Sequence, residues 1–226
     1  MLNYTVLEIP PKQTHEWLLK KHYAHRIPSI TYAFGLYDNS EMLQGICTFG
    51  TPSSSTLRIG VCGESYSEIV IELNRLCLND GLPNNSASYF VSRCLKKLPN
   101  PKVIISYSDK SQGHTGYIYQ ACNFIYTGLS AKRTDWKIKG LEKLHGQSIA
   151  DISRHQVNRV EYMREKYGDD FYLEDRARKH RYVYFLGNKR QVHEMKINLK
   201  YPIMPYPKGD NKRYDASFIP DVQLKF

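Results

Sequence analysis

The sequence predicts an α/β protein with a mixed central sheet flanked by helices. Apolar, β-rich runs alternate with helix-forming stretches up to about residue 135. A helix between two strands gives parallel neighbours, whereas the short turn NSEM at 39–42 joins two strands as an antiparallel hairpin, so the sheet is expected to be mixed. Hydrophobic residues make up 41% of the 226 residues, which is enough for a packed core.

Strands are assigned where β-branched and aromatic residues alternate, or form short apolar runs between turn residues. Thr14 is expected to cap the first helix and Pro28 to end it, and a cluster of Asn and Ser begins the second. The expected elements are, in order, a strand at 4–9, a helix at 14–26, strands at 29–38 and 43–50, a Ser- and Gly-rich loop at 51–68, a strand at 69–78, a helix at 84–98, a strand at 102–108, a helix at 113–124 and a strand at 124–131.

The chain changes character after residue 140. Residues 151–168 predict a polar amphipathic helix, and residues 176–200 hold eight Lys or Arg and one Glu. The stretch 201–218 is rich in Pro and Tyr, and its aromatic residues favour an ordered, extended tail. We therefore expect a catalytic core at 1–140 and a helical and extended basic region at 141–226 that packs on it.

The charge balance favours an anionic partner. Lys and Arg number 32 against 22 Asp and Glu, a net charge of +10, which indicates nucleic acid first and a membrane surface second. The five cysteines are scattered without a C-x-x-C pair, so they are expected to be reduced thiols rather than zinc ligands. No apolar run approaches the roughly 20 residues of a membrane span. These observations predict a cytoplasmic protein without a membrane partner.

Polar residues crowd the end of the strand at 102–108. Asp109 falls at its carboxyl end, where ligands of parallel sheets bind, and Tyr119 lies on the helix that follows. A carboxylate beside a phenol supports acid–base chemistry or stacking on a base, and a hydrogen-bonded core tyrosine is the alternative. On the strand at 69–78, alternation places Glu72 on one face and Arg75 on the other. Glu72 can deprotonate an amine, or it forms a purely structural ion pair.

Two further groups are candidates for the same site. His22 and Tyr23 precede the hairpin, where a histidine can act as a general base or a metal ligand, or simply be exposed at a helix end. Asn85, Ser86 and Ser88 stand at a helix start, whose free N–H groups can hold an anionic part of a cofactor. The alternative for these three is an ordinary helix cap.

The basic segment suggests contacts with phosphates. Lysines and arginines there are interleaved with aromatic residues, which can stack on an exposed base. A solvated basic face is the alternative. The candidate DNA-binding residues are Arg176, Arg178, Lys179, Arg181, Lys189 and Arg190.

Together these elements and motifs resemble a known family. The order of strands and helices resembles the GNAT acyltransferase fold. More narrowly, the pair HY at 22–23, IELNRLCL at 71–78 and YSDKSQGHTGYIYQACNFIYTG at 107–128 resemble the Mom proteins of phages. The resemblance covers roughly 15–135 and, more loosely, the segment KHRYVYFLG at 179–187 and the tail LKYPIMPYPK at 199–208.

The resemblance implies an enzyme that converts adenine in double-stranded DNA to an N6-carbamoylmethyl form, which shields phage DNA from restriction in the infected host. It places functional residues on Asp109, Tyr119, His22 and Tyr23, and a functional serine near Ser86. It also implies iron, and the GNAT fold implies acetyl-CoA or a related acyl donor. The stretch DGLPNNSAS at 80–88 lacks the usual Q/R-x-x-G-x-G/A signature, which argues against standard acetyl-CoA binding.

Two other functions stay open at this point. One is an acyl-CoA-dependent N-acetyltransferase acting on a small amine or a protein, with Glu72 as base and Tyr117 or Tyr119 as acid. The other is a DNA-binding protein without catalysis. The sequence leaves open the metal, the donor of the transferred group and whether the protein forms a homodimer.

Overall fold

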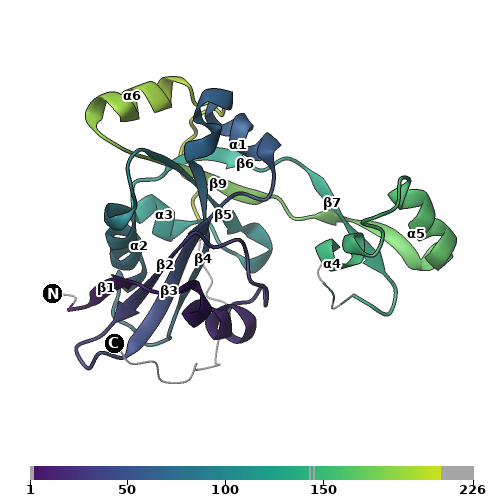
Figure 1. Ribbon diagram of the computed structural model, residues 1–226, viewed down its shortest axis with the longest axis horizontal. Helices are drawn as coiled ribbons and strands as arrows, with labels where there is room; N and C mark the ends of the chain where they lie inside the picture. The colour runs from purple at the N-terminus through teal and green to yellow at the C-terminus, as the bar shows by residue number, and fades with distance from the viewer. Residues whose placement is uncertain (1–2, 143, 145, 210–226) are drawn as a thin grey trace. The chain divides into compact units, whose positions relative to one another are not determined.

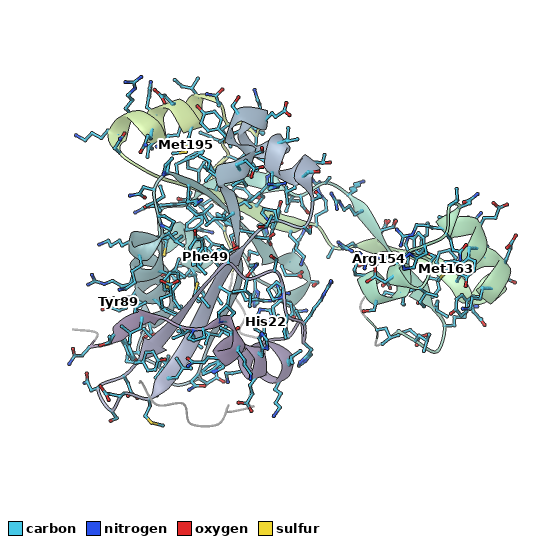
Figure 2. The ribbon with its side chains drawn as sticks, in the orientation of Figure 1. His22, Phe49, Tyr89, Arg154, Met163 and Met195 are labelled. Carbon is cyan, nitrogen blue, oxygen red and sulfur yellow. The ribbon has the colours of Figure 1, made fainter. Side chains whose placement is uncertain are left out.

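A computed structural model describes residues 3–142, 144 and 146–209. The chain divides into two compact units. The first combines the chain up to Leu129 with the chain from Lys179 onward, and the second is Ser130–Arg178 (Figure 1). Each unit has its own core, with Phe49 buried in the first and Met163 buried in the second (Figure 2).

A seven-stranded sheet forms the centre of the first unit. Its order is β1-β2-β3-β4-β5-β9-β6, and β4 and β5 are its one parallel pair of neighbours within the described chain. The mixed sheet flanked by helices that the sequence predicted is therefore confirmed. The strands are β1 (Thr5–Glu8), β2 (Tyr32–Tyr37), β3 (Leu43–Gly50), β4 (Val70–Leu78), β5 (Lys102–Asp109), β6 (Ile125–Leu129) and β9 (Lys179–Leu186).

Helices cover both faces of this sheet, and the side chains of β5 alternate between the two cores that the helices enclose. Ile104 packs in the core that α2 covers, whereas Val103 and Ile105 pack with Val61 of α1 and Met195 of α6. The alternation thus buries β5 on both sides, as expected for a central strand. The helices are α1 (Ser55–Cys62), α2 (Ser86–Lys97), α3 (Tyr117–Ala121) and α6 (Lys189–Ile197).

The predicted helix at 14–26 differs in form. A 3₁₀ turn at Pro11–Thr14 leads into a π-helical turn at Trp17–Lys21, whose Trp17 and Leu18 are buried. The helix ends there because His22 adopts an extended backbone. His22 and Tyr23 therefore follow the helix rather than lying on it.

The stretch 51–68 is not the loop that its composition suggested. It contains α1 and a 3₁₀ helix, Glu64–Ile69. The Ser54 side chain accepts a hydrogen bond from the Leu57 amide and so caps α1, and Gly63 ends it with a φ of 92°. The serines that suggested a loop are in part a helix cap.

The second unit is a small α/β body. Its two-stranded sheet pairs β7 (Arg133–Ile138) with β8 (Phe171–Arg176), and α4 (Gly146–Asp151), α5 (Arg159–Tyr167) and a 3₁₀ turn (Gly168–Asp170) complete it. Its core contains Ile138, Ile149, Met163 and Phe171. The single helix predicted at 151–168 is therefore wrong: α5 begins only at Arg159.

The unit is inserted between two strands that are neighbours in the main sheet. Strands β6 and β9 are antiparallel, and Leu129 lies opposite His180. The chain thus leaves and re-enters the sheet at adjacent positions, where a short hairpin turn would suffice. The second unit replaces that turn.

The basic segment 176–200 is not an appended tail. Its first half forms β9, an interior strand between β5 and β6, and its second half forms α6. Residues 201–209 run as an extended segment on β6, where the Met204 amide donates to the Tyr126 carbonyl at 2.9 Å and the Tyr206 hydroxyl to the Phe124 carbonyl at 2.7 Å. The rest of the predicted tail, 210–218, lies outside the described residues. None of the helices that the structure describes is long and apolar enough to span a membrane.

Candidate functional site

The site lies where two parallel strands part. Strands β4 and β5 are paired from Val70 opposite Val103 to Leu73 opposite Ser106, and both continue beyond that point without pairing. A cleft of about 570 Å³ opens between their carboxyl-terminal halves. Backbone groups of β4 that face this gap have no ladder partners on β5, which gives the cleft polar walls.

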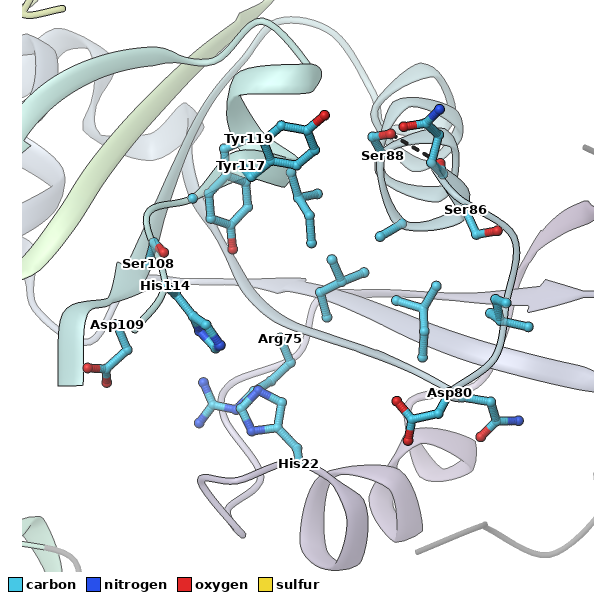
Figure 3. Close-up of a pocket in the computed structure, with 18 of the residues that line it drawn as sticks. His22, Arg75, Asp80, Ser86, Ser88, Ser108, Asp109, His114, Tyr117 and Tyr119 are labelled. Carbon is cyan, nitrogen blue, oxygen red and sulfur yellow. Dashed lines mark hydrogen bonds between the residues drawn. The ribbon is translucent and has the colours of Figure 1, made fainter. Parts of the chain in front are cut away.

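The cleft is lined by residues from several segments (Figure 3). One side presents the end of β5 with His22 and Arg75, and the other presents the turn after β4 and the start of α2. Of the candidates, the lining residues are His22, Tyr23, Asn85, Ser86, Ser88, Asp109 and Tyr119.

Asp109 is the last residue of β5, and its carboxyl group is ionised. Its Oδ1 accepts hydrogen bonds from the amide and the hydroxyl of Ser111, at 3.0 and 2.6 Å, and its Oδ2 lies 2.9 Å from Nζ of Lys179. Burial acts to raise the pKa of Asp109, but the Ser111 hydrogen bonds and the Lys179 charge outweigh it and leave the pKa below its ordinary value. The carboxylate is therefore ionised at neutral pH and can accept a proton or a hydrogen bond.

Tyr119 is held against the core by aromatic neighbours. Its ring lies 5.4 Å from the rings of both Phe124 and Tyr182. Burial raises the pKa of Tyr119, against the opposing effect of a hydrogen bond with Ser106. The phenol is therefore protonated at neutral pH and can donate a hydrogen bond or a proton.

Gly116 allows α3 to approach this closely. Its φ is 83°, and a Cβ there would stand 2.4 Å from the ring of Tyr182. Only glycine satisfies both conditions without strain. The residue before α3 therefore fixes how near Tyr119 comes to the sheet.

His22 and Tyr23 form one wall of the cleft. Their rings stack with centroids 4.5 Å apart, and the Nδ1 of His22 accepts a hydrogen bond from the Ala24 amide at 3.1 Å. Burial, followed by the charge of Arg75, lowers the pKa of His22 to about 3. Burial and the charge of Asp109 raise the pKa of Tyr23 to about 12. The wall thus presents a neutral imidazole and a neutral phenol.

The neutral His22 predicts a pH-dependent stability. In the folded protein the imidazole stays neutral, whereas in the unfolded chain it takes up a proton below about pH 6.5. Stability from His22 is therefore complete above about pH 6.5 and lost as the pH falls toward about 3. Between about pH 7.5 and pH 5, the unfolding free energy should fall by about 2 kcal/mol more in the wild type than in His22→Gln. Urea unfolding at the two pH values measures this, and equal losses in both proteins would contradict it.

The start of α2 forms the opposite rim. Asn85 precedes the helix with a φ of 69°, and the hydroxyls of Ser86 and Ser88 donate to the carbonyls of Pro83 and Asn85 at 2.7 and 3.1 Å. Because the hydroxyl protons are used internally, an anion here would be bound by the backbone N–H groups of the first turn.

Glu72, the predicted base, is not among the residues that line the cleft. Burial raises its pKa, and the charges of Arg75 and Lys179 partly offset this. The structure does not place this predicted base in the cleft.

Arg75 is a site residue that sequence alternation assigned to the wrong face. Thr48 lies opposite Arg75 and Phe49 opposite Leu73, so Asn74 is an extra residue in β4. Residues that lie opposite each other on paired strands are on the same face of the sheet. Gly50 is opposite Glu72, and because Thr48 and Gly50 are two residues apart on β3, they are on the same face as well. The bulge therefore turns Arg75 to the face of Glu72.

Arg75 brings a guanidinium group to the cleft. One of its guanidinium NH₂ groups donates to the Asn74 carbonyl at 2.7 Å, and its buried Nε has no hydrogen-bond partner in the described structure. Burial lowers the pKa of Arg75, and the nearby Tyr23 and Glu72 oppose this. A cation in this setting favours an oxygen ligand.

Two further lining residues come from the same motif, and one of them, Tyr117, was the alternative acid to Tyr119. Tyr117, the first residue of α3, is 60% exposed at the rim of the cleft, and the His114 ring lies edge-on to Tyr23 at 6.3 Å. The motif that contains Asp109 and Tyr119 also contains these two residues, and its dense spacing of polar groups is the signal that points to them.

The six predicted DNA-binding cations are divided between the two units. Lys179 pairs with Asp109, and Arg181 stacks on Tyr201 at 3.3 Å and donates to Thr127. Arg190 pairs with Glu194 on α6, which Lys189 begins. The remaining two, Arg176 and Arg178, belong to the second unit.

The cleft does not fit the iron that the resemblance implied. Within the described residues, no three His, Cys, Asp or Glu side chains gather where they could hold a metal ion. Both oxygens of Asp109 and the Nδ1 of His22 already have protein partners. No step is therefore assigned to a metal.

A carboxylate and protonated phenols between two splayed strands can move protons during a group transfer, so fold and cleft together define a transferase. Comparison with known families identifies the particular one. The Mom protein family matches residues 3–208, and the chain belongs to this family of DNA-modifying enzymes. The methylcarbamoylase Mom of Escherichia phage Mu is 29% identical over 193 residues, which cover 83% of this chain and 77% of that protein. The resemblance predicted from the motifs is confirmed.

Solved structures with a similar outline are acetyltransferases. A spermidine/spermine N-acetyltransferase from Vibrio cholerae, in complex with manganese ions, has a TM-score of 0.44 at 9% identity and covers 81% of this chain and 93% of that chain. An N-acetyltransferase from Staphylococcus aureus Mu50 has a TM-score of 0.43 at 12% identity and covers 81% of this chain and 99% of that one.

Proposed function

We propose that this protein attaches a small amide-containing group to N6 of adenine in double-stranded DNA and so protects the DNA from restriction. The observation that supports this most is the meeting of Asp109 and Tyr119 in one cleft with His22 and Tyr23, in a member of the Mom family. Stacked bases do not admit an enzyme pocket around N6, so the target adenine must be turned out of the duplex, at a cost of a few kcal/mol.

The proton chemistry follows from the ionisation states. The N6 lone pair is delocalised into the purine ring, so the amine is a weak nucleophile that needs its proton removed as it attacks. Asp109, ionised at neutral pH, accepts that proton, and the protonated Tyr119 donates one to the leaving group. In the transfer, a bond forms between N6 and a carbon of the donor, and the bond from that carbon to the leaving group breaks.

Two isomers of the added group need to be distinguished. The family resemblance implies a carbamoylmethyl group, H₂N–CO–CH₂–, whereas the phage Mu relative is named a methylcarbamoylase, and a methylcarbamoyl group is CH₃–NH–CO–. The second joins N6 to a carbonyl carbon, as in ordinary acyl transfer. In either case the group carries a carbonyl oxygen, and a cleft-lining Arg75 with an unused donor supports its binding there.

The donor of the group would lie toward α2. Residues of its first turn line the cleft, and the backbone N–H groups of a helix start favour an anionic portion of the donor. A coenzyme A conjugate of the transferred group, related to the acyl donor that the fold implies, has a pyrophosphate that suits such a position. When bound, it would supply the activated carbon that N6 attacks, while the residues of this chain orient it and move the protons.

The test is nucleoside analysis of DNA from cells that express the protein. We expect a new adenosine adduct, absent from cells without the gene, that co-elutes with one of two synthetic standards. Standards are required because the two isomers have the same elemental composition, so mass alone does not separate them. DNA of unchanged composition would refute the proposal, and acetylation of a small amine with no DNA adduct would favour the acetyltransferase alternative.

A further inference from the structure

The second unit separates its charges along its length. Residues 134–175 hold seven Lys or Arg and nine Asp or Glu. The two ends of the unit, residues 130–133 and 176–178, hold four cations and no acidic residue. We call these four the stem patch: Lys132, Arg133, Arg176 and Arg178.

The strand register concentrates these cations. Arg133 of β7 lies directly opposite Arg176 of β8, and the chain continues from them to Lys132 and Arg178. Like charges opposite each other on paired strands are destabilising. Asp135 relieves this in part through its ion pair with Arg176, while the side chains of Lys132 and Arg133 are exposed.

Cations of this two-stranded sheet that lie away from the stem patch are paired with acidic residues. Lys137 pairs with Glu174 at 3.4 Å and Lys139 lies 3.9 Å from Asp170. Along the β7–β8 pair, the lysines distant from the stem patch are neutralised by ion pairs, whereas positive charge is in excess at the stem patch. Two opposed arginines beside exposed cations are expected where an anion from another molecule neutralises their charge.

We propose that the stem patch binds the phosphate backbone of duplex DNA and supplies affinity that does not depend on base sequence. This inference rests on the proposed function, because it takes DNA as the substrate. Linear phosphate arrays suit exposed Lys and Arg side chains on a two-stranded ribbon, and such contacts position a protein on DNA without reading its sequence. The inserted unit would then hold the duplex while the cleft of the first unit carries out the chemistry.

The full-length protein is titrated against a fluorescent duplex of mixed sequence, and anisotropy is followed from about 50 to 200 mM salt. The test variant is Lys132→Gln with Arg133→Gln, and the matched control is Arg164→Gln with Lys166→Gln on exposed α5 positions of the same unit. Both remove two charges. The test variant should bind more weakly, with a log–log salt slope shallower by about 2 and a salt effect over this range reduced roughly tenfold.

Equal slopes for the test variant and the wild type, or the same reduction in the control, would overturn the inference. Matching melting temperatures exclude unfolding as the cause of a loss. The result is independent of the adduct test: an adduct with an unaffected slope refutes the stem patch alone. A reduced slope without any adduct refutes the proposed function alone.

Discussion

Replacement of Asp109 by asparagine should lower the rate of adenine modification by about 10²–10⁴-fold, the range expected when a general acid–base group is lost. Asparagine keeps the size of the side chain and can still accept the hydrogen bonds from Ser111. It cannot take up the N6 proton. Lys179, whose side chain is 37% exposed, retains access to water, so the variant should fold normally.

The measurement is the fraction of modified adenosine in DNA from cells with equal amounts of folded protein. Asp170→Asn is the matched control, because that carboxylate also faces a lysine, Lys139, but lies in the second unit. Its activity should be unchanged. Wild-type activity in Asp109→Asn would remove the proton acceptor from the mechanism proposed above.

Arg75→Met is the second variant with a large expected effect. Methionine fills similar space but offers no donor, so we expect the rate to fall by about 10²–10³-fold, as when one donor to a developing oxyanion is removed. Arg75→Lys should restore only part of the activity, because an ammonium group lacks the planar set of donors of a guanidinium. Rates under single-turnover conditions would separate this effect from weaker substrate binding.

The structure provides a close control for this variant. Arg58 of α1 also has a buried Nε without a hydrogen-bond partner in the described chain, but it pairs with Glu68 and does not line the cleft. Arg58→Met should therefore keep full activity. If both variants lose activity equally, the loss reflects folding rather than a role of Arg75 in the cleft.

Local sequence signals were sufficient for much of the site. Asp109 follows an apolar strand directly, so its place at a strand end could be predicted from the order of residue types alone. Tyr119 and the start of α2 were predicted in the same way, from helix signals a few residues long. These are short-range features, in which the residues that fix the backbone are adjacent to the functional side chain.

The tertiary structure decided what depends on partners distant in the chain. The bulge at Asn74 exists only in the pairing of β4 with β3, and it reverses the face on which Arg75 lies. Strand β9 read as a basic tail because its charges dominate its composition, yet pairing with β5 and β6 places it inside the sheet. The sequence by itself determined the α/β class, the family and the polar end of β5, since these rest on local pattern and motif. Register, strand order and the inserted unit required the folded chain, because each depends on which distant segments form hydrogen bonds with one another.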